Sequence, residues 1–154
     1  MIPVYWNEIE DLVVEKKDMT EALATIERLI TATNEHDVDT LALCFAEDYV
    51  NETPAHPARG FRGRSQVRRN WEQIFASVPD LNARLIRHAV RDDAVWTEWE
   101  MFGTRRDGSA HRLRGVILFG VVDDLIQWAR FYLEPLDVGE ANVDDAVRHQ
   151  VGRQ

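Results

Sequence analysis

The chain has 154 residues, of which 45% are hydrophobic, and a formal net charge of −9 at pH 7. A chain of this length and composition forms one ordinary domain with a sizeable core. The negative charge argues against nucleic acid and anionic membranes as partners, because both require a dominant positive field. One cysteine excludes an intrachain disulfide, and there is neither a basic leader nor an apolar run of membrane length, so we expect a cytoplasmic protein.

Three helices are predicted in the first half of the chain. Asp18 and the acidic residue three positions later have the spacing of a capping box, and apolar residues then recur at helical intervals, which predicts a helix from Asp18 to about Asn34. Asp37 can cap a second, shorter helix. Ser65 can cap a third, which ends at Pro79.

The hydrophobic period changes to two after the third helix, which indicates strands. Leu81–Arg91 alternates between two faces, and Ala94–Pro135 contains three runs rich in β-branched and aromatic residues. Two-residue turns are predicted at 107–108 and 123–124. Helices followed by a strand meander predict an α+β fold, with the helices on one face of a curved antiparallel sheet.

The pairing of the three later strands decides which residues share a face. Two-residue turns place Met101 opposite Arg114 and Ile117 opposite Arg130. One face is then largely apolar and is expected to line a pocket, with Trp99, Met101, Arg114, Val116, Leu118 and Phe131. The other face carries Glu98, Glu100, Arg130 and Tyr132, and a shift of one residue exchanges the two sets.

The charged residues of these strands are open to two interpretations. If Glu98, Glu100 and Arg130 line a pocket, the paired carboxylates beside an arginine form a candidate acid/base site. Otherwise they form cross-strand ion pairs on an outer surface or in a dimer interface. Arg114 contacts an anionic or carbonyl-bearing ligand, or else forms an ion pair at the rim of the pocket.

The order of the predicted elements and several short motifs resemble the SnoaL-like polyketide cyclases. These belong to the nuclear-transport-factor-two-like superfamily, together with ketosteroid isomerase and limonene epoxide hydrolase. The resemblance implies a cone-shaped α+β barrel, a deep pocket between about three N-terminal helices and the concave face of the sheet, and a homodimer formed through the sheet. It divides the chain into an N-terminal extension (1–17), a SnoaL-like domain (18–136) and a C-terminal tail (137–154). The motifs that carry it are residues 49–51, 60–64, 103–104, 114–116 and 126–132.

The resemblance implies roles for some residues and departs from the family at others. Tyr49 and Asn51 match the tyrosine and asparagine that help to hold the attacking water in the epoxide hydrolases, although both can instead satisfy loop backbone groups. Trp99 and Met101 take the positions of that family's arginine and first aspartate, and Phe131 takes that of its second aspartate. Since these three side chains transfer no proton, the family's acid/base mechanism is not expected in this register.

The expected function is the binding of a small hydrophobic molecule of polyketide, terpenoid or steroid type, without a cofactor. If the protein is an enzyme, cofactor-independent isomerisation, cyclisation or hydration fits best, with Tyr49 and Asn51 positioning water or a substrate carbonyl. The alternative is a non-catalytic ligand-binding or interaction module of the same fold.

The remaining histidines and arginines add two smaller expectations. No two of the five histidines have metal-ligand spacing, so no metal site is predicted, and His56 is placed at the pocket mouth. A cluster of arginines fits either a phosphate or carboxylate site or a solvated basic face; it consists of Arg59, Arg62, Arg64, Arg68 and Arg69.

Overall fold

The computed structural model describes the backbone of residues 6–152 and the side chains of residues 19–152. The first five residues of the expected N-terminal extension therefore lie outside the described residues. The α+β class is confirmed. The elements in chain order are α1 (Trp6–Asn34), α2 (Val38–Leu43), β1 (Phe45–Glu52), a short 3-10 helix η1 (Pro57–Arg59), β2 (Phe61–Arg62), α3 (Arg64–Ser77), β3 (Asn82–Arg91), β4 (Ala94–Thr104), β5 (Ala110–Val122), β6 (Leu125–Pro135) and α4 (Val143–Gln150).

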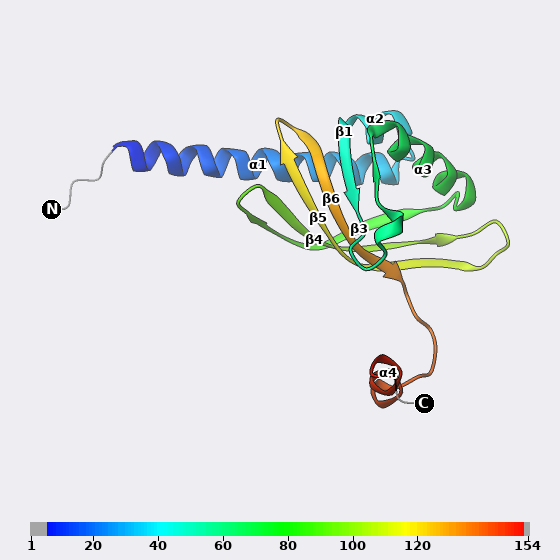
Figure 1. Cartoon of the computed structure of the whole chain (residues 1–154). Coiled ribbons are helices and arrows are strands. Elements are labelled where there is room, and N and C mark those ends of the chain that lie inside the picture. The colour runs from blue at the N-terminus through cyan, green and yellow to red at the C-terminus, as the bar shows by residue number, and fades with distance from the viewer. Residues whose placement is uncertain (1–5, 153–154) are drawn as a thin grey trace.

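The strands form one six-stranded sheet in the order β2-β1-β6-β5-β4-β3 (Figure 1). Neighbouring strands are antiparallel except β1 and β6, which are parallel. The sheet is therefore mixed, and it differs from the expected antiparallel sheet at this one pair. No hairpin joins β1 to β6, because α3 and four strands lie between them in the chain, so turn geometry does not fix their relative direction.

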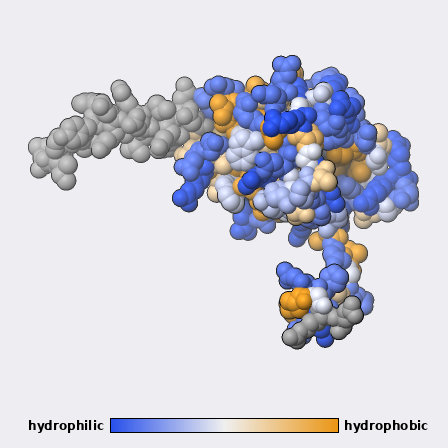
Figure 2. Space-filling view, viewed as in Figure 1, coloured by the Kyte–Doolittle hydropathy of each residue, from blue (hydrophilic) through white to orange (hydrophobic). Residues whose placement is uncertain are grey.

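The helices α1, α2 and α3 pack against one face of the sheet, here called the inner face, and the core lies between them. Trp99, Phe119 and Tyr49 are among the largest fully buried side chains of this core. Figure 2 shows a mostly hydrophilic surface with scattered hydrophobic residues on the side that it presents. Helix α4 lies apart from the sheet at the end of an extended segment (Figure 1). None of the described helices is long and apolar enough to span a membrane.

Two of the predicted helix starts are wrong. Helix α1 begins at Trp6, so Asp18 lies inside it; residues 6–17 contain good helix formers and no proline or glycine that would stop the helix. The N-cap of α3 is Gly63, at a φ of +94°, instead of Ser65. The cap of α2 is confirmed, since the Asp37 carboxylate accepts a hydrogen bond from the backbone of its first turn.

The loop between β4 and β5 is one residue longer than predicted. Thr104 lies opposite Ala110, and the Arg105 N–H donates to the Ser109 carbonyl at 2.9 Å. The turn thus has three residues between Arg105 and Ser109. The last of them is Gly108, whose φ of +85° is the left-handed conformation that such loops require.

This longer loop shifts β5 by one residue relative to β4. The predicted pairing of Met101 with Arg114 is wrong, and Arg114 lies opposite Glu100 instead. Because side chains alternate along a strand, Arg114, Val116 and Leu118 all move to the opposite face of the sheet from the one predicted. That face, turned away from the helices, is here called the outer face.

The turn between β5 and β6 is confirmed, but the pairing beyond it is not. Asp123 and Asp124 form a two-residue turn with φ of 51° and 61°, as this turn type requires. A β-bulge close to the turn then inserts one extra residue in β6, so Ile117 lies opposite Phe131 and not Arg130. The two shifts add up to two residues between β4 and β6, and because side chains alternate, Phe131 stays on the same face as Trp99.

The close approach of β5 and β6 depends on Gly115, and substitution there tests the observed register. Gly115 has a φ of +151°, and a Cβ atom on it would lie 2.0 Å from the Tyr132 carbonyl oxygen. We predict that Gly115→Ala lowers the free energy of unfolding by about 3 kcal/mol or more. Gly108→Ala is the control, because its Cβ meets nothing within 4 Å and only its left-handed backbone costs about 1 kcal/mol. Urea unfolding measures the free energy of unfolding of both variants. Equal decreases for Gly115→Ala and Gly108→Ala would contradict the observed register.

Candidate functional site

A cavity with a volume of about 270 Å³ lies on the inner face, between α3 and strands β1 and β6. It is here called the inner cavity. Most of its lining is aromatic or aliphatic, with a few polar groups. The lining residues are Phe45, Tyr49, Asn51, Thr53, Arg59, Phe61, Val67, Asn70, Trp71, Ile74, Phe131 and Leu133.

A small void of about 20 Å³ lies deeper in the core and shares part of this lining. Phe45, Trp71 and Phe131 border both spaces, while Trp99 and Met101 border only the deeper one. Three of the predicted pocket residues, Trp99, Met101 and Phe131, are therefore brought together on the inner face.

The periodicities of two elements explain the lining. Tyr49 and Asn51 are two residues apart on β1, so both point to the inner face. Val67, Trp71 and Ile74 follow the i, i+4, i+7 spacing of one face of α3. The strand places its polar pair opposite the apolar face of the helix.

Tyr49 and Asn51 form a buried hydrogen-bonded pair. The Tyr49 hydroxyl donates to Asn51 Oδ1 at 2.9 Å, and the two residues are 1% and 7% exposed. Burial raises the pKa of the Tyr49 hydroxyl well above its ordinary value, so Tyr49 keeps its proton. Asn51 Nδ2 has no hydrogen-bond partner among the described residues. Because every fully buried polar side-chain atom of the described residues has a partner, Nδ2 must open into the inner cavity.

The candidate acid/base residues lie together on the outer face, away from the inner cavity. Arg87 pairs with Glu98 at 2.8 Å, and Arg130 pairs with Glu52 at 2.8 Å. Glu100 accepts hydrogen bonds from both Arg84 and Arg114. The structure thus has the cross-strand ion-pair arrangement and not a carboxylate pocket.

Four of the residues expected in the pocket lie elsewhere. Arg114, Val116 and Leu118 are on the outer face because of the longer loop, and Arg114 forms its ion pair with Glu100 at 2.9 Å. His56 directly precedes η1 and pairs with Glu134 at 2.9 Å, and it does not line the inner cavity.

The polar residues Arg59 and Asn70 line the inner cavity but were not predicted as site residues. Arg59 was considered only as a member of a basic cluster, and no local pattern shows that η1 folds back over β1. Asn70 is three residues after Val67 and four before Ile74, so helical periodicity places it on the same face of α3 as these two residues. This spacing is a signal that could have identified it. Of the described residues lining the inner cavity, Arg59 is the one with a formal charge at neutral pH, and none is Asp, Glu or His.

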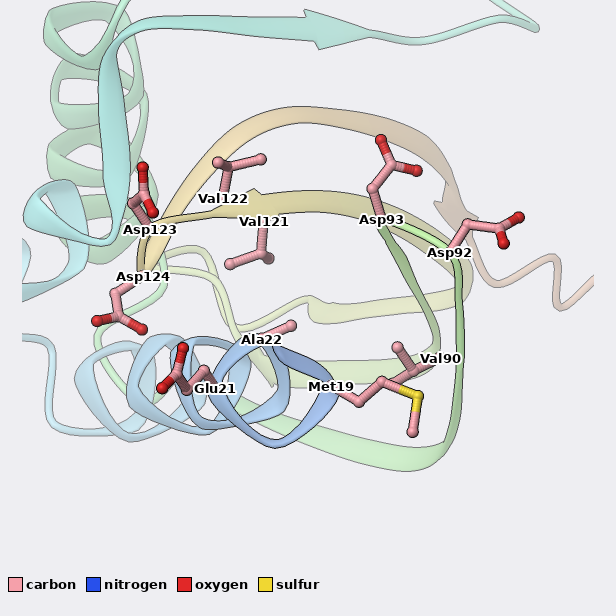
Figure 3. Close-up of a pocket in the computed structure, with 10 residues that line it drawn as sticks. All are labelled: Met19, Glu21, Ala22, Val90, Asp92, Asp93, Val121, Val122, Asp123 and Asp124. Carbon is pink, nitrogen blue, oxygen red and sulfur yellow. The ribbon is translucent and has the colours of Figure 1, made fainter. Parts of the chain in front are cut away.

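A second cavity, of about 310 Å³, lies where α1 meets the β3–β4 and β5–β6 turns. It is here called the acidic cavity. Figure 3 shows Asp92 and Asp93 on one side of it and Asp123 and Asp124 on the other, with Glu21 on the neighbouring helix. Its floor is apolar and includes Met19, Ala22, Val90, Val121 and Val122. No described group of three or more His, Cys, Asp or Glu residues has the arrangement of a metal site.

Comparisons with known proteins place these features in one family. Residues 26–129, more than half of the chain, match the profile of the SnoaL-like domain. A sequence comparison with curated proteins finds no match.

Solved structures share the fold at low sequence identity. An LEH-like epoxide hydrolase from Mycobacterium tuberculosis is 21% identical, with a TM-score of 0.67, over 86% of this chain and 97% of that one. Another M. tuberculosis protein, in complex with estradiol-17beta-hemisuccinate, is 19% identical, with a TM-score of 0.62, over 80% and 95%. A Catenulispora acidiphila protein with a ketosteroid isomerase-like fold is 15% identical, with a TM-score of 0.62, over 70% and 84%.

The outer-face ion pairs predict a pH dependence of stability. Hydrogen bonds from Arg114 and Arg84 hold the pKa of Glu100 below its ordinary value of 4.5. A carboxyl with a lowered folded-state pKa stabilises the fold above that ordinary value, and this contribution is lost as the pH falls through the folded-state pKa. We therefore expect Glu100→Gln to be less stable than the parent at pH 7, with a difference that shrinks as the pH falls below 4.5.

Urea unfolding at several pH values measures this difference. Glu140→Gln is the control, since Glu140 makes no hydrogen bond or ion pair with the described part of the chain. A difference between parent and Glu100→Gln that is independent of pH would contradict the assignment.

Proposed function

Because the chain belongs to the SnoaL-like domain family, we propose that it binds a small, largely apolar molecule in the inner cavity. The observation that carries this proposal is the lining, in which aromatic and aliphatic side chains surround a few polar groups, as in most small-molecule sites. The volume of about 270 Å³ is at the lower end of ordinary ligand pockets, roughly 300–1,000 Å³.

The same lining favours binding over acid/base catalysis. General acid/base chemistry requires a group that exchanges a proton near the working pH. Tyr49 keeps its proton, Asn51 is a neutral amide, and no described lining side chain is a carboxylate or an imidazole. A water molecule held by Asn51 would have no base beside it, so the non-catalytic alternative is the one that we propose.

A structural neighbour supports this proposal. The M. tuberculosis protein in complex with estradiol-17beta-hemisuccinate has the same fold and holds a ringed, largely apolar molecule. The two chains are 19% identical, so the neighbour supports the kind of ligand and not its identity.

Filling the inner cavity should abolish binding. We predict that Leu133→Trp, at the lining of the inner cavity, lowers the affinity for 4-isopropylbenzyl alcohol by about tenfold or more. Tyr132→Trp is the matched control, because Tyr132 is the preceding residue of β6 and points to the outer face. Isothermal titration calorimetry measures both. The proposal fails if the parent protein binds neither this alcohol nor the matching carboxylic acid, 4-isopropylbenzoate, or if the two variants bind the alcohol equally well.

We also propose that a second copy of the chain covers the outer face. Trp96, Phe102 and Tyr132 leave 41–49% of their surface exposed there, more than isolated surface residues explain. Carboxylates and guanidinium groups alternate around them, so a copy related by two-fold symmetry presents opposite charges to each.

Charge insertion tests this dimer. Trp96→Glu is expected to convert a dimer into a monomer, because it places a charge at the centre of the apolar part of the outer face. Val143→Glu is the control, since Val143 lies on α4, away from the sheet. Light scattering coupled to size-exclusion chromatography gives the mass. A monomeric parent protein, or a dimeric Trp96→Glu variant, would contradict the proposal.

A further inference from the structure

The polar part of the inner cavity is formed where η1 folds over the end of β1. Asn51 lies opposite Phe61 of β2, and a Cβ atom on Gly60 would lie 3.2 Å from the Asn51 carbonyl oxygen. The segment that carries Arg59 therefore runs directly against the residue whose amide opens into the cavity. Asn70 faces the same space from α3.

Each amide oxygen of this polar part already accepts one hydrogen bond. Asn51 Oδ1 accepts from the Tyr49 hydroxyl at 2.9 Å, and Asn70 Oδ1 accepts from Gln66 Nε2 at 2.7 Å. The group of each amide that has no partner among the described residues is its Nδ2, which only donates. The Trp71 indole N–H, another pure donor, also lacks a partner among the described residues.

Arg59 adds an unpaired positive charge. Other arginines of the same region form ion pairs, such as Arg68 with Asp39 at 2.6 Å. Arg59 makes no side-chain hydrogen bond and no ion pair with any described residue, and the described lining has no carboxylate to neutralise it. The side-chain acceptors that remain are the hydroxyl oxygens of Tyr49 and Thr53 and one lone pair on each of the two amide oxygens. The lining thus offers several donors and a cation but few acceptors.

We propose that the ligand of the inner cavity is an amphipathic carboxylic acid, whose carboxylate is bound by Arg59, Asn51 and Asn70 while its apolar part packs against Trp71 and Phe131. This inference rests on the proposed function, and it names the ligand's chemical class. A carboxylate only accepts hydrogen bonds and matches a guanidinium geometrically, so it complements this set of donors. A neutral alcohol offers these donors one uncharged oxygen, and a hydrocarbon offers none, so each satisfies fewer of the donors than a carboxylate does.

The acidic cavity cannot take the same ligand. Its opening is surrounded by Asp92, Asp93, Asp123 and Asp124 (Figure 3), so a carboxylate there would meet only like charges. A neutral molecule meets no such repulsion. The ionised acid therefore distinguishes the inner cavity from the acidic cavity, although their volumes are similar.

A matched pair of probes tests the inference. The probes are 4-isopropylbenzoate and 4-isopropylbenzyl alcohol, which share a ring and differ in the polar group. We expect the full-length protein to bind the benzoate about tenfold more tightly than the alcohol in calorimetric titrations at pH 7. Arg59→Gln should remove this preference by weakening binding of the benzoate far more than binding of the alcohol. Arg62→Gln, which changes an equally unpaired arginine outside the lining, should keep the preference.

A second variant, on α3, tests the inference without changing η1, the short helix that contains Arg59. Asn70→Asp replaces a donor by a carboxylate on α3 and should weaken binding of the benzoate more than binding of the alcohol. If the two probes bind equally well and neither Arg59→Gln nor Asn70→Asp changes their ratio, the inference is overturned and the proposed function stands. If the parent protein binds neither probe, both are overturned.

Discussion

The register of β4, β5 and β6 is the constraint on which the rest of the structure depends. Because side chains alternate along a strand, a shift of one residue moves every side chain of that strand to the opposite face. The three-residue loop that ends at Gly108 and the β-bulge in β6 fix this register. Together they place Ile117 and Phe119 in the core and leave Arg114 on the outer face, where it pairs with Glu100.

This separation of the two faces determines what the protein can do chemically. The carboxylates that are candidates for acid/base catalysis are held in ion pairs on the outer face, where solvent screens them and arginines lie on neighbouring strands. The inner cavity retains an aromatic lining and a polar part that donates hydrogen bonds. The fold is shared with epoxide hydrolase and ketosteroid isomerase-like structures, and the chemistry of the inner cavity depends on its side chains and not on the backbone.

Sequence reasoning predicted the features that depend on local periodicity. The three helices, the strand meander, the turn at Asp123-Asp124 and the shared face of Trp99 and Phe131 all follow from spacing that recurs along the chain. It failed where one extra residue in a loop or a bulge changes the pairing of the strands. The composition of the loop between β4 and β5 is compatible with a turn of two residues and with a turn of three. It also missed Arg59 as a cavity residue, because only the tertiary fold brings η1 over β1.

A crystal structure of the protein with 4-isopropylbenzoate bound tests the central claim most directly. The account predicts the ring between α3 and β6, beside Trp71 and Phe131, with the carboxylate within hydrogen-bond distance of Asn51 Nδ2 and of the Arg59 guanidinium. A ring bound on the outer face or in the acidic cavity, with the inner cavity left empty, would contradict it.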